Sequence, residues 1–398
     1  MVVRAVAFEE GKLPSAVLNL SYIINEGHSL PVLSLVSDSP SDFSTMYNGK
    51  RKDMEIPGAL TLYREDGGFS APCGIEMHGQ TSLDLPKKNM SVRFRAAYGQ
   101  EEVHCDVFGG GVTEFTNFVL RSGQDFTRTI VRNELLQNLG LQMGDSMLNQ
   151  RSIHCVLYIN GQYSGIYTLT EKLNESHYAK HRLVSRDSVT VNKSPVGEGS
   201  AFYNEVIRYA LTHDLSKAEN YEYFCNLVDI DSLIDWMIIE GYSANTDIYD
   251  SNVRYCRSTE DDGRWRFMLY DMDATMVSSA HLYANVLRPV STECSVFITP
   301  LMKNEQFRHR FLCRAGEVLN SVLTNENVVA ELDRLTSLVA PEVERDYARF
   351  NRAVGTWQYE TEYLRDAILS GDWRQHAVDA ISSYFMLTEA EKTACFGR

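Results

Sequence analysis

The sequence contains few clustered positive charges. Its 398 residues include 38 Lys and Arg against 53 Asp and Glu, which gives a net charge of -15. The basic cluster that stands out is "GKRKD" at residues 49–53. Nucleic-acid binding needs a concentrated basic face, so the composition argues against nucleic acid as a partner. A basic protein or a metal–nucleotide complex would be attracted instead.

Closely spaced cysteines and long apolar runs are also lacking. The eight cysteines come no closer than Cys294 and Cys313, so the sequence has neither a CxxC pair nor a zinc-ligand spacing. We expect buried free thiols. No apolar run is long enough to span a membrane, and no signal-peptide pattern follows Met1. Because the first residues alternate like a β hairpin, we expect the sequence to be part of a longer chain.

Several enzyme motifs are missing as well. The sequence has no GxSxG, which argues against a common class of serine hydrolase, and no HExxH, which argues against zincin chemistry. It also has no GxGxxG loop, since "HGQTS" at residues 78–82 offers only one glycine.

Residues up to about 190 follow the period of two that is typical of β-strands. Asn160-Gly161 between two apolar runs predicts a two-residue hairpin turn. One helix is expected at residues 127–140, with Thr127 as its N-cap and Gly140 as its end. The predicted strands lie in residues 30–38, 59–66, 69–79, 89–99, 117–123 and 153–172.

Beyond about residue 199 the apolar period changes to 3.6, which predicts helices. One of them, "DSLIDWMIIEGYSAN", is expected to begin at Asp231 or Ser232. Residues 252–271 interrupt the helices with a predicted two-stranded insert. The whole pattern predicts an α+β protein of two lobes, a β-rich N-lobe with one main helix and a mostly helical C-lobe, with a cleft between them.

Acidic residues flank this insert. "NTDIYDSNVRYC" holds Asp247 and Asn252, and "YDMDA" holds Asp271 and Asp273 after the apolar strand "RWRFMLYD". Alternation places both later acids in line with the buried face of that strand. A carboxylate in such a place is costly unless it is paired or bound to a cation, so we expect a divalent metal, with Mg²⁺ favoured by so sparse a ligand set.

The order and spacing of these residues match kinase-type phosphoryl transfer. In this hypothesis Asp247 accepts a proton from an attacking hydroxyl, Asp271 is the main metal ligand, and Asn252 is a further ligand of the same metal. A structural alternative stays open, in which the acids only cap turns.

Two lysines enter a predicted strand in "HGQTSLDLPKKNMSVRF". Phosphoryl transfer needs a lysine on the nucleotide phosphates. Alternation groups Lys88 with apolar residues and Lys87 with polar ones, so Lys88 is the favoured ligand, although a solvated lysine pair is also open. Thr81 and Ser82 precede them and would offer hydroxyls to phosphate.

These segments together resemble the CotH family of atypical protein kinases, known from bacterial spore coats. The likeness is carried, in the order of the family, by "GQTSLDLPKKNMSVRF", "TRTIVRNEL", "YINGQYSGIYTLTEKL", "NTDIYDSNVRYC" and "RWRFMLYDMDATM". It covers roughly residues 28–390.

The resemblance implies a divergent two-lobed protein-kinase-like fold that binds ATP and Mg²⁺, with Mn²⁺ as a substitute, and phosphorylates serine in proteins. It implies that Asp247 is the catalytic acid, Asp271 the essential metal ligand, and Asn252 and Asp273 auxiliary ligands. The implied nucleotide-binding residues are Lys88 or Lys87, Thr81, Ser82, the Glu171-Lys172 backbone at the adenine, and Arg132 or Glu134 near the phosphates.

The resemblance also shapes the expected organisation. We expect residues 1–25 to be the last strands of a preceding β-sandwich module, residues 26–190 the N-lobe, and residues 191–398 the C-lobe. A bacterial cell-surface, secreted or spore-coat setting is implied, with a basic, serine-rich protein as substrate. The chain departs from the family at His78, where Arg is common, and at "YDMD", where Trp-Asp-Leu-Asp is common.

Two other functions fit the same residues. One is a weak or inactive kinase-like module for surface or spore-coat assembly, in which the acids are structural. The other is a metal-dependent nucleotide-sugar transferase, which also uses a D-x-D at a strand end but calls for an early βαβ half that this β-rich first half lacks.

Overall fold

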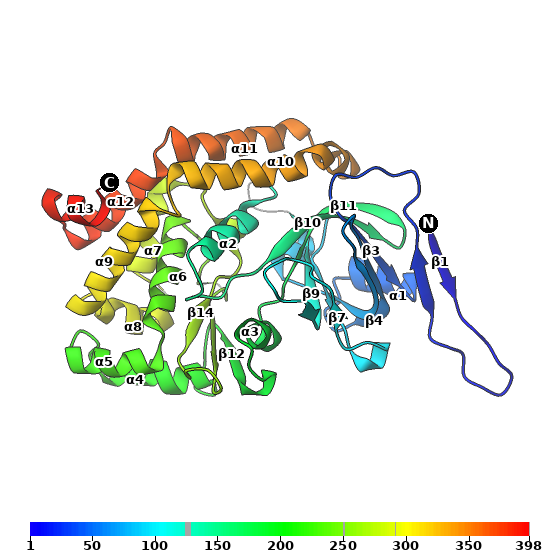
Figure 1. Cartoon of the computed structure of the whole chain (residues 1–398), viewed down its shortest axis with the longest axis horizontal. Helices are drawn as coiled ribbons and strands as arrows, with labels where there is room; N and C mark the ends of the chain where they lie inside the picture. Colours follow the sequence, from blue (N-terminus) through cyan, green and yellow to red (C-terminus); the bar gives the residue numbers. More distant parts are fainter. Residues whose placement is uncertain (124–128, 250, 291, 398) are drawn as a thin grey trace. The chain divides into compact units, whose positions relative to one another are not determined.

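The computed structural model describes residues 1–123, 129–249, 251–290 and 292–397. The chain divides into two compact units, each built from separate stretches of sequence. The first comprises residues 1–124, 151–172 and 336–358, and the second comprises residues 125–150, 173–335 and 359–398. Figure 1 shows the elements of both, and each unit is described by itself.

The first unit is built on a closed barrel of seven strands (Figure 1). Neighbours around the barrel pair antiparallel, except that β3 and β10 pair in parallel and close it. The strands are β3 (Val32–Ser37), β4 (Glu55–Tyr63), β5 (Phe69–Met77), β6 (Met90–Arg93), β9 (Asn117–Arg121), β10 (Ser152–Ile159) and β11 (Gln162–Thr170).

Apolar side chains fill the barrel, as expected for a small closed barrel. Leu33, Leu60, Ile75, Met90 and Val92 are fully buried in its core. The turn between β10 and β11 has φ of 50° at Asn160 and 82° at Gly161, which confirms the predicted hairpin.

Shorter elements surround this barrel. Helix α1 (Pro40–Asn48) was not predicted; Ser39 caps it by accepting a hydrogen bond from Asp42 N at 3.3 Å, and Phe43 and Met46 pack into the barrel core. Two small sheets complete the unit, β1 (Val2–Ala5) with β2 (Leu18–Ser21) and β7 (Val103–His104) with β8 (Glu114–Phe115).

The second unit is mostly helical and carries one three-stranded sheet, in the order β12 (Val189–Lys193), β13 (Arg254–Ser258) and β14 (Arg266–Met268). Its helices include α2 (Arg132–Gln142), α3 (Glu175–Arg182), α4 (Arg208–Thr212), α5 (Ala218–Leu227), α6 (Ile230–Tyr242), α7 (Ala284–Leu287), α8 (Thr292–Leu301), α9 (Glu305–Asn320), α12 (Trp373–Phe385) and α13 (Glu389–Phe396). Helices α10 (Asn325–Arg349) and α11 (Val354–Leu369) contribute residues to both units.

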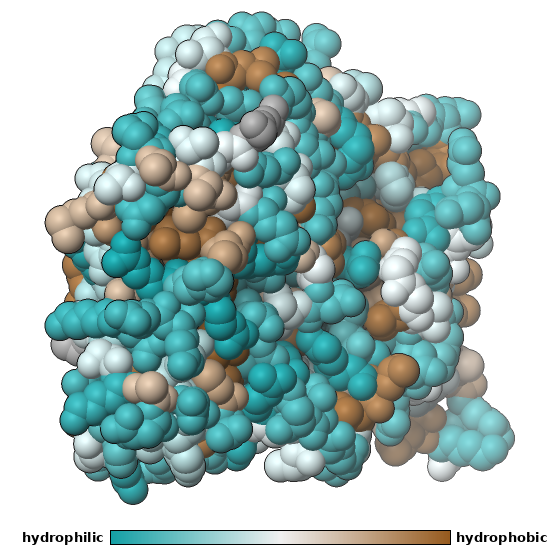
Figure 2. Space-filling view, turned by 60° about the vertical axis from the view of Figure 1, so that its left-hand side comes forward, coloured by the Kyte–Doolittle hydropathy of each residue, from teal (hydrophilic) through white to brown (hydrophobic). Residues whose placement is uncertain are grey.

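The surface in view in Figure 2 is mostly hydrophilic, with hydrophobic residues confined to small patches. Such a surface agrees with the large excess of acidic residues in the sequence. Among the described helices, none combines the length and apolar character needed to cross a membrane.

The predicted two-lobed protein-kinase-like fold is wrong, although the mixed α+β content is found. The structure has a closed seven-stranded barrel where an N-lobe sheet with one main helix was expected. The helix assigned to that sheet is α2, which belongs to the second unit, while the barrel unit contains the unexpected α1. Alternation predicts strands, but barrel closure depends on the pairing of β3 with β10, far apart in the sequence.

Local expectations need correction too. Helix α2 continues through Gly140, where a Cβ atom would collide with the Asn149 side chain, so this glycine permits close packing and does not end the helix. The predicted cap Thr127 lies outside the described residues. Helix α6 is capped by Asp229, which accepts from Ser232 N at 3.2 Å. The two-stranded insert gains a third strand, β12.

Candidate functional site

The loop that follows α6 in the second unit carries Asp247 and Asn252. The Nδ2 atom of Asn252 donates to the main-chain oxygen of Asp247 at 3.0 Å and to its Oδ2 at 3.1 Å. Asn252 is 9% exposed, whereas Asp247 is partly exposed. The amide therefore fixes both the backbone and the carboxylate of Asp247, and its own oxygen is the atom that would ligate a metal.

Asp271 and Asp273 lie on a tight turn after β14. The strand ends at Met268, and Asp271 adopts a left-handed conformation with φ of 57° and ψ of 66° just before a 3₁₀ turn over Met272–Ala274. The strand alternation therefore stops before either acid. The expectation that it would align both acids with the buried face of the strand is not met. Both acidic residues are partly exposed. A left-handed conformation strains the backbone of a non-glycine residue such as Asp271, and strain of this kind is common at functional sites.

Backbone hydrogen bonds hold the two acid-bearing segments together. Thr246 N donates to Ala274 O at 3.2 Å, and Met276 N donates to Ser243 O at 2.6 Å. Two residues that precede Asp247 are thereby joined to residues just beyond Asp273. The structure thus brings Asp247, Asn252, Asp271 and Asp273, which the sequence predicts as one site, into a single region of the second unit.

Helix α2 supports the Asp271 segment through three side chains. Asn133 Oδ1 accepts from Met272 N at 3.2 Å, and Gln137 Nε2 donates to Leu269 O at 2.8 Å. The fully buried Arg132 donates through Nη1 to Thr275 O. Arg132, predicted near nucleotide phosphates, is thus bonded to the backbone beside the acids, and its neighbour Glu134 is also buried.

A buried carboxyl lies behind the Asp247 loop. Glu240, in the last turn of α6, accepts a hydrogen bond from Asn245 Nδ2 at 2.9 Å. Burial raises the pKa of Glu240 to about 8, against the lowering effect of the Asn245 hydrogen bond and with a further rise from the charge of Asp271. This group is therefore mostly protonated at neutral pH.

Arg254, on strand β13, brings a positive charge near Asp271. The guanidinium of Arg254 lies 4.1 Å from the ring centroid of Tyr270, and the residue is 8% exposed. Burial lowers the pKa of Arg254, while Tyr270 and the charge of Asp271 act to raise it. The positive charge of Arg254 thus offsets part of the local negative charge.

The oxygen donors here suit a hard divalent cation that keeps water or substrate ligands. In the described parts of the chain, Asp247, Asp271 and Asp273 are not among the groups of three or more potential ligands whose donor atoms all lie within 4.8 Å. A sparse set of this kind fits Mg²⁺, which usually takes one or two carboxylates plus phosphate oxygens and water.

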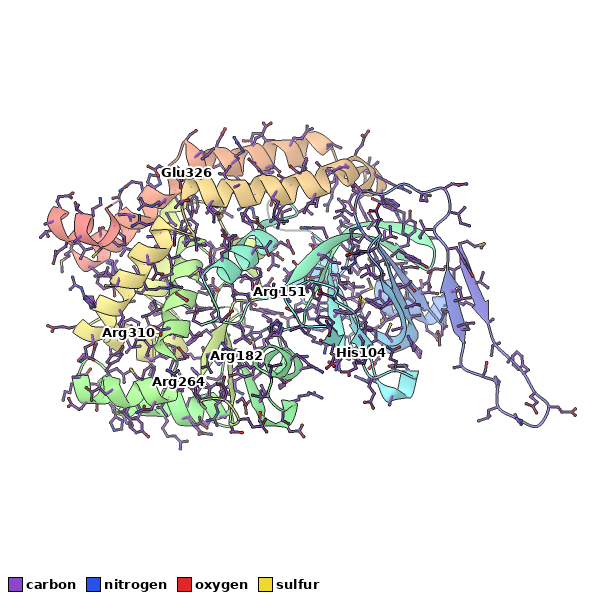
Figure 3. The ribbon with its side chains drawn as sticks, viewed as in Figure 1. His104, Arg151, Arg182, Arg264, Arg310 and Glu326 are labelled. Atoms are coloured by element: carbon purple, nitrogen blue, oxygen red, sulfur yellow. The ribbon has the colours of Figure 1, made fainter. Side chains whose placement is uncertain are left out.

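The first unit contains a different group with metal-ligand chemistry, on the small β7–β8 sheet. Glu102, His104 and Glu114 each bring one ligand atom to within 4.8 Å of the others, and Figure 3 labels His104. None of the residues predicted for the functional site lies on these two strands.

The two predicted phosphate-binding lysines have different surroundings in the first unit. Lys87 is 1% exposed, and its Nζ donates to Asp346 Oδ1 at 2.8 Å and to Ile166 O at 2.9 Å. Lys88 is 9% exposed, and its Nζ donates to Leu85 O at 2.9 Å. Strand β6 begins only at Met90, so the alternation used to separate the lysines does not extend to them.

Thr81 and Ser82 lie in a 3₁₀ turn just ahead of these lysines. Gly79 has φ of 92°, and a Cβ atom there would collide with Ser82 Oγ. Asn89 supports the turn, since its Nδ2 donates to Ser82 Oγ at 3.3 Å while its Oδ1 accepts from Ser122 N at 2.8 Å. The glycine is required for this compact geometry.

Glu171, predicted at the adenine, directly follows β11 and is 3% exposed. Its Oε2 accepts from Arg151 N at 2.9 Å, and its own N donates to Arg151 O at 3.1 Å. Figure 3 labels Arg151. The side chain of Glu171 therefore holds the start of β10, and its backbone amide is also bonded there.

Sequence reasoning missed several residues that shape these sites, namely Asn89, Asn133, Glu240, Asn245 and Arg254. Glu240 gave a detectable signal, because it is an acid in the apolar run "DWMIIEGY". The asparagines gave none, since their roles depend on which backbone groups the fold brings near.

Comparison with protein families identifies a family that the sequence matches. The family described as "CotH kinase protein" matches residues 75–370, which is most of the chain. No curated protein matches the sequence.

Proposed function

The chain belongs to the CotH kinase protein family, and we propose that it transfers the γ-phosphoryl group of ATP to serine hydroxyls of a protein substrate. Kinases use a nucleotide and a metal in general. The choice of ATP, Mg²⁺ and serine is our proposal.

The observation that carries this proposal is the hydrogen-bonded pair of Asp247 and Asn252. In kinase-type phosphoryl transfer, an acid that accepts the hydroxyl proton is followed five positions later by a metal-binding Asn. Here the Asn amide nitrogen bonds to the acid, and the segment bearing Asp271 is tied to the same loop through Thr246. These contacts support distinct roles for the three residues.

In the proposed reaction the serine oxygen attacks the γ-phosphorus and forms a new P–O bond. The bond from the γ-phosphorus to the β,γ-bridging oxygen breaks, and ADP leaves. Asp247 accepts the proton of the serine hydroxyl. Asp271, Asp273 and Asn252 would hold Mg²⁺, which when bound neutralises charge on the nucleotide phosphates.

We further propose nucleotide contacts from the first unit. Lys88 is the better candidate for the phosphates, because the ammonium of Lys87 is engaged by Asp346 and Ile166. Thr81 and Ser82 would bind phosphate oxygens, and the backbone near Glu171 would meet adenine. Arg132 would act mainly through the backbone that carries Asp271.

The substrate is proposed to be basic as well as serine-rich. The net charge of -15 and the partly exposed acids around Asp247 would attract positive charge near the reacting hydroxyl.

Phosphoryl transfer from labelled ATP tests the proposal directly. The purified protein is incubated with Mg²⁺ or Mn²⁺ and with either a serine-rich basic peptide or its Ser→Ala counterpart. We expect label on the serine peptide alone. Asp247→Asn should lower the rate by about 10²-fold or more with ATP binding retained, since it removes the proton acceptor. Asp271→Asn should weaken metal-dependent ATP binding.

Asp187→Asn provides the matched control, because Asp187 is an exposed acid on a separate turn of the second unit. It should leave transfer unchanged. If the wild-type protein never transfers label to any serine peptide, and Asp271→Asn leaves ATP binding unaltered, the kinase function is refuted and the inactive assembly module takes its place.

A further inference from the structure

We propose that Glu240 and Asn245 are positioning residues that fix the main chain of Asp247 for phosphoryl transfer. This inference rests on the proposed function, because it assigns the two residues a role in that reaction. Neither residue is expected to touch substrate.

Asn245 connects the end of α6 to the Asp247 loop through both polar groups of its side chain. Its Oδ1 accepts from Asp247 N at 3.0 Å, and its Nδ2 donates to Glu240 Oε2 at 2.9 Å. Its main-chain oxygen accepts from Asn285 Nδ2 at 2.9 Å. An amide held at both ends has one orientation, so the acceptor facing Asp247 N is fixed.

Glu240 is the group that sets this orientation. It is 3% exposed and follows Met237, Ile238 and Ile239, which are fully buried. A carboxyl in such surroundings is costly unless it makes hydrogen bonds, and an apolar residue would pack there without that cost. The hydrogen bond from Asn245 Nδ2 therefore supplies the partner that the buried Glu240 carboxyl needs.

Asn245 also contacts the segment that carries Asp271 and Asp273. Asn245 Nδ2 lies 3.8 Å from Met272 Sδ, and the next residue, Thr246, donates from N to Ala274 O. A change in the orientation of Asn245 would shift the loop at Asp247 and its attachment beside Asp271 together. Small displacements of a reacting group are expensive, about 10²-fold in rate for about 1 Å.

Protonation of Glu240 agrees with this role. Because burial raises its pKa to about 8, the residue is mostly neutral at neutral pH and adds little charge beside Asp271. A glutamine at this position would keep an oxygen that accepts from Asn245 Nδ2, whereas leucine would fill the space without an acceptor.

The experiment compares Glu240→Gln, Glu240→Leu and Asn245→Ala. With the serine peptide and Mg²⁺-ATP, we expect Glu240→Leu and Asn245→Ala to lower kcat by about 10- to 100-fold with the KM for ATP within about twofold. Glu240→Gln should retain kcat within about threefold, because it restores the acceptor.

Asn304→Ala is the matched control for general destabilisation. Asn304 is a buried asparagine that caps α9 by accepting from Phe307 N at 3.1 Å, and it makes its other bonds to Leu215 and Ser216. Measured below its unfolding temperature, this variant should keep the wild-type kcat. An equal loss in Asn304→Ala and Glu240→Leu, or an unchanged kcat in Glu240→Leu, would overturn the positioning role.

Hydrogen exchange gives a second readout that needs no activity. The N–H of Asp247 is the donor to Asn245 Oδ1, so its exchange should be faster in Glu240→Leu and Asn245→Ala and unchanged in Glu240→Gln and Asn304→Ala. Absence of phosphoryl transfer in the wild-type protein, together with unaltered ATP binding in Asp271→Asn, refutes the kinase function. Exchange of the Asp247 amide at the wild-type rate in Glu240→Leu refutes the positioning role.

Discussion

Lys87 and Asp346 form a buried ion pair although 259 positions separate them in the sequence. Their Nζ and Oδ1 atoms lie 2.8 Å apart, and both side chains are almost completely buried. Asp346 Oδ1 also accepts from Ile166 N at 2.8 Å, so one carboxylate joins α10, β11 and the segment before β6. The pair gives Lys87 a structural role within the first unit.

Removing one partner of this pair should be strongly destabilising. Lys87→Met leaves the Asp346 carboxylate buried without its cation, and we expect a loss of about 3–5 kcal/mol in the free energy of unfolding. The double variant Lys87→Met/Asp346→Leu should regain much of this loss, because an apolar pair has no uncompensated charge. Urea unfolding of the single and double variants measures both effects, and a double variant as unstable as Lys87→Met would contradict them.

Lys88→Met should behave in the opposite way. We expect little change in stability, since its ammonium donates to Leu85 O and lies 5.5 Å from the centroid of the Tyr47 ring but has no buried acidic partner among the contacts described. We also expect weaker binding of Mg²⁺-ATP, by about tenfold, through loss of a phosphate ligand. Calorimetric titration measures the affinity. Lys52→Met, at an exposed lysine of the same unit, is the control. Unchanged ATP affinity in Lys88→Met would remove Lys88 from the proposed site.

The raised pKa of Glu240 predicts how stability depends on pH. In the unfolded chain this carboxyl titrates near about 4.3, whereas in the folded protein its pKa is about 8. Between these values the folded state holds a proton that the unfolded state has lost. The stabilisation of the folded protein by this proton is therefore fully present below about pH 4. It declines as the pH rises to about 8, by at most about 1.4 kcal/mol per pH unit.

Glu240→Gln should remove this decline, because the amide does not titrate. Unfolding temperatures of the wild type and the variant between pH 5 and pH 8 test the prediction. The wild type should lose stability relative to Glu240→Gln as the pH rises. Parallel curves would mean that Glu240 is ionised in the folded protein.

Acid should weaken a cluster around Arg266 in the second unit. Burial by itself would raise the pKa of Asp262, but hydrogen bonds from Arg266 and Arg264 outweigh it and lower the pKa to about 2. Figure 3 labels Arg264. An acid with a lowered folded pKa stabilises above its unfolded value, so this contribution is lost as the pH falls from about 4 to about 2.

Asp262→Asn should therefore cost stability at pH 7 and progressively less below pH 4. Because Asp262 is partly exposed, solvent screening limits the loss at pH 7 to on the order of 1 kcal/mol. Chemical denaturation at pH 7 and pH 3 measures the difference. A loss of equal size at both values would show that the charge of Asp262 is not responsible.

The strands of the barrel could be predicted from local pattern, but the barrel could not. Alternation in the runs that became β5 and β9 is a property of neighbouring residues, and each of these strands lies where the sequence indicates. Strand β4 (Glu55–Tyr63) overlaps only part of the predicted strand at residues 59–66. The parallel pairing of Val32 with Val156 is a contact between distant segments, and no local pattern encodes it. The expected two-lobed fold failed at this step.

The candidate site divides in the same way. The spacing of Asp247, Asn252, Asp271 and Asp273 is visible in the sequence, and the structure gathers these residues into one region. Their supports Asn133 and Glu240 could not be assigned beforehand, because an amide or a buried acid acquires a role only from the groups packed against it.

By itself, the sequence determined the chemistry that is offered: the oxygen ligands, the candidate proton acceptor, the lysines and the family to which the chain belongs. Tertiary structure alone decided which of these groups are already engaged. Lys87 and Lys88 are adjacent and chemically identical, yet only Lys87 pairs with Asp346, because the fold places α10 beside it. A charged group takes its role from the charges and the dielectric around it, and those are set by residues far away in the chain.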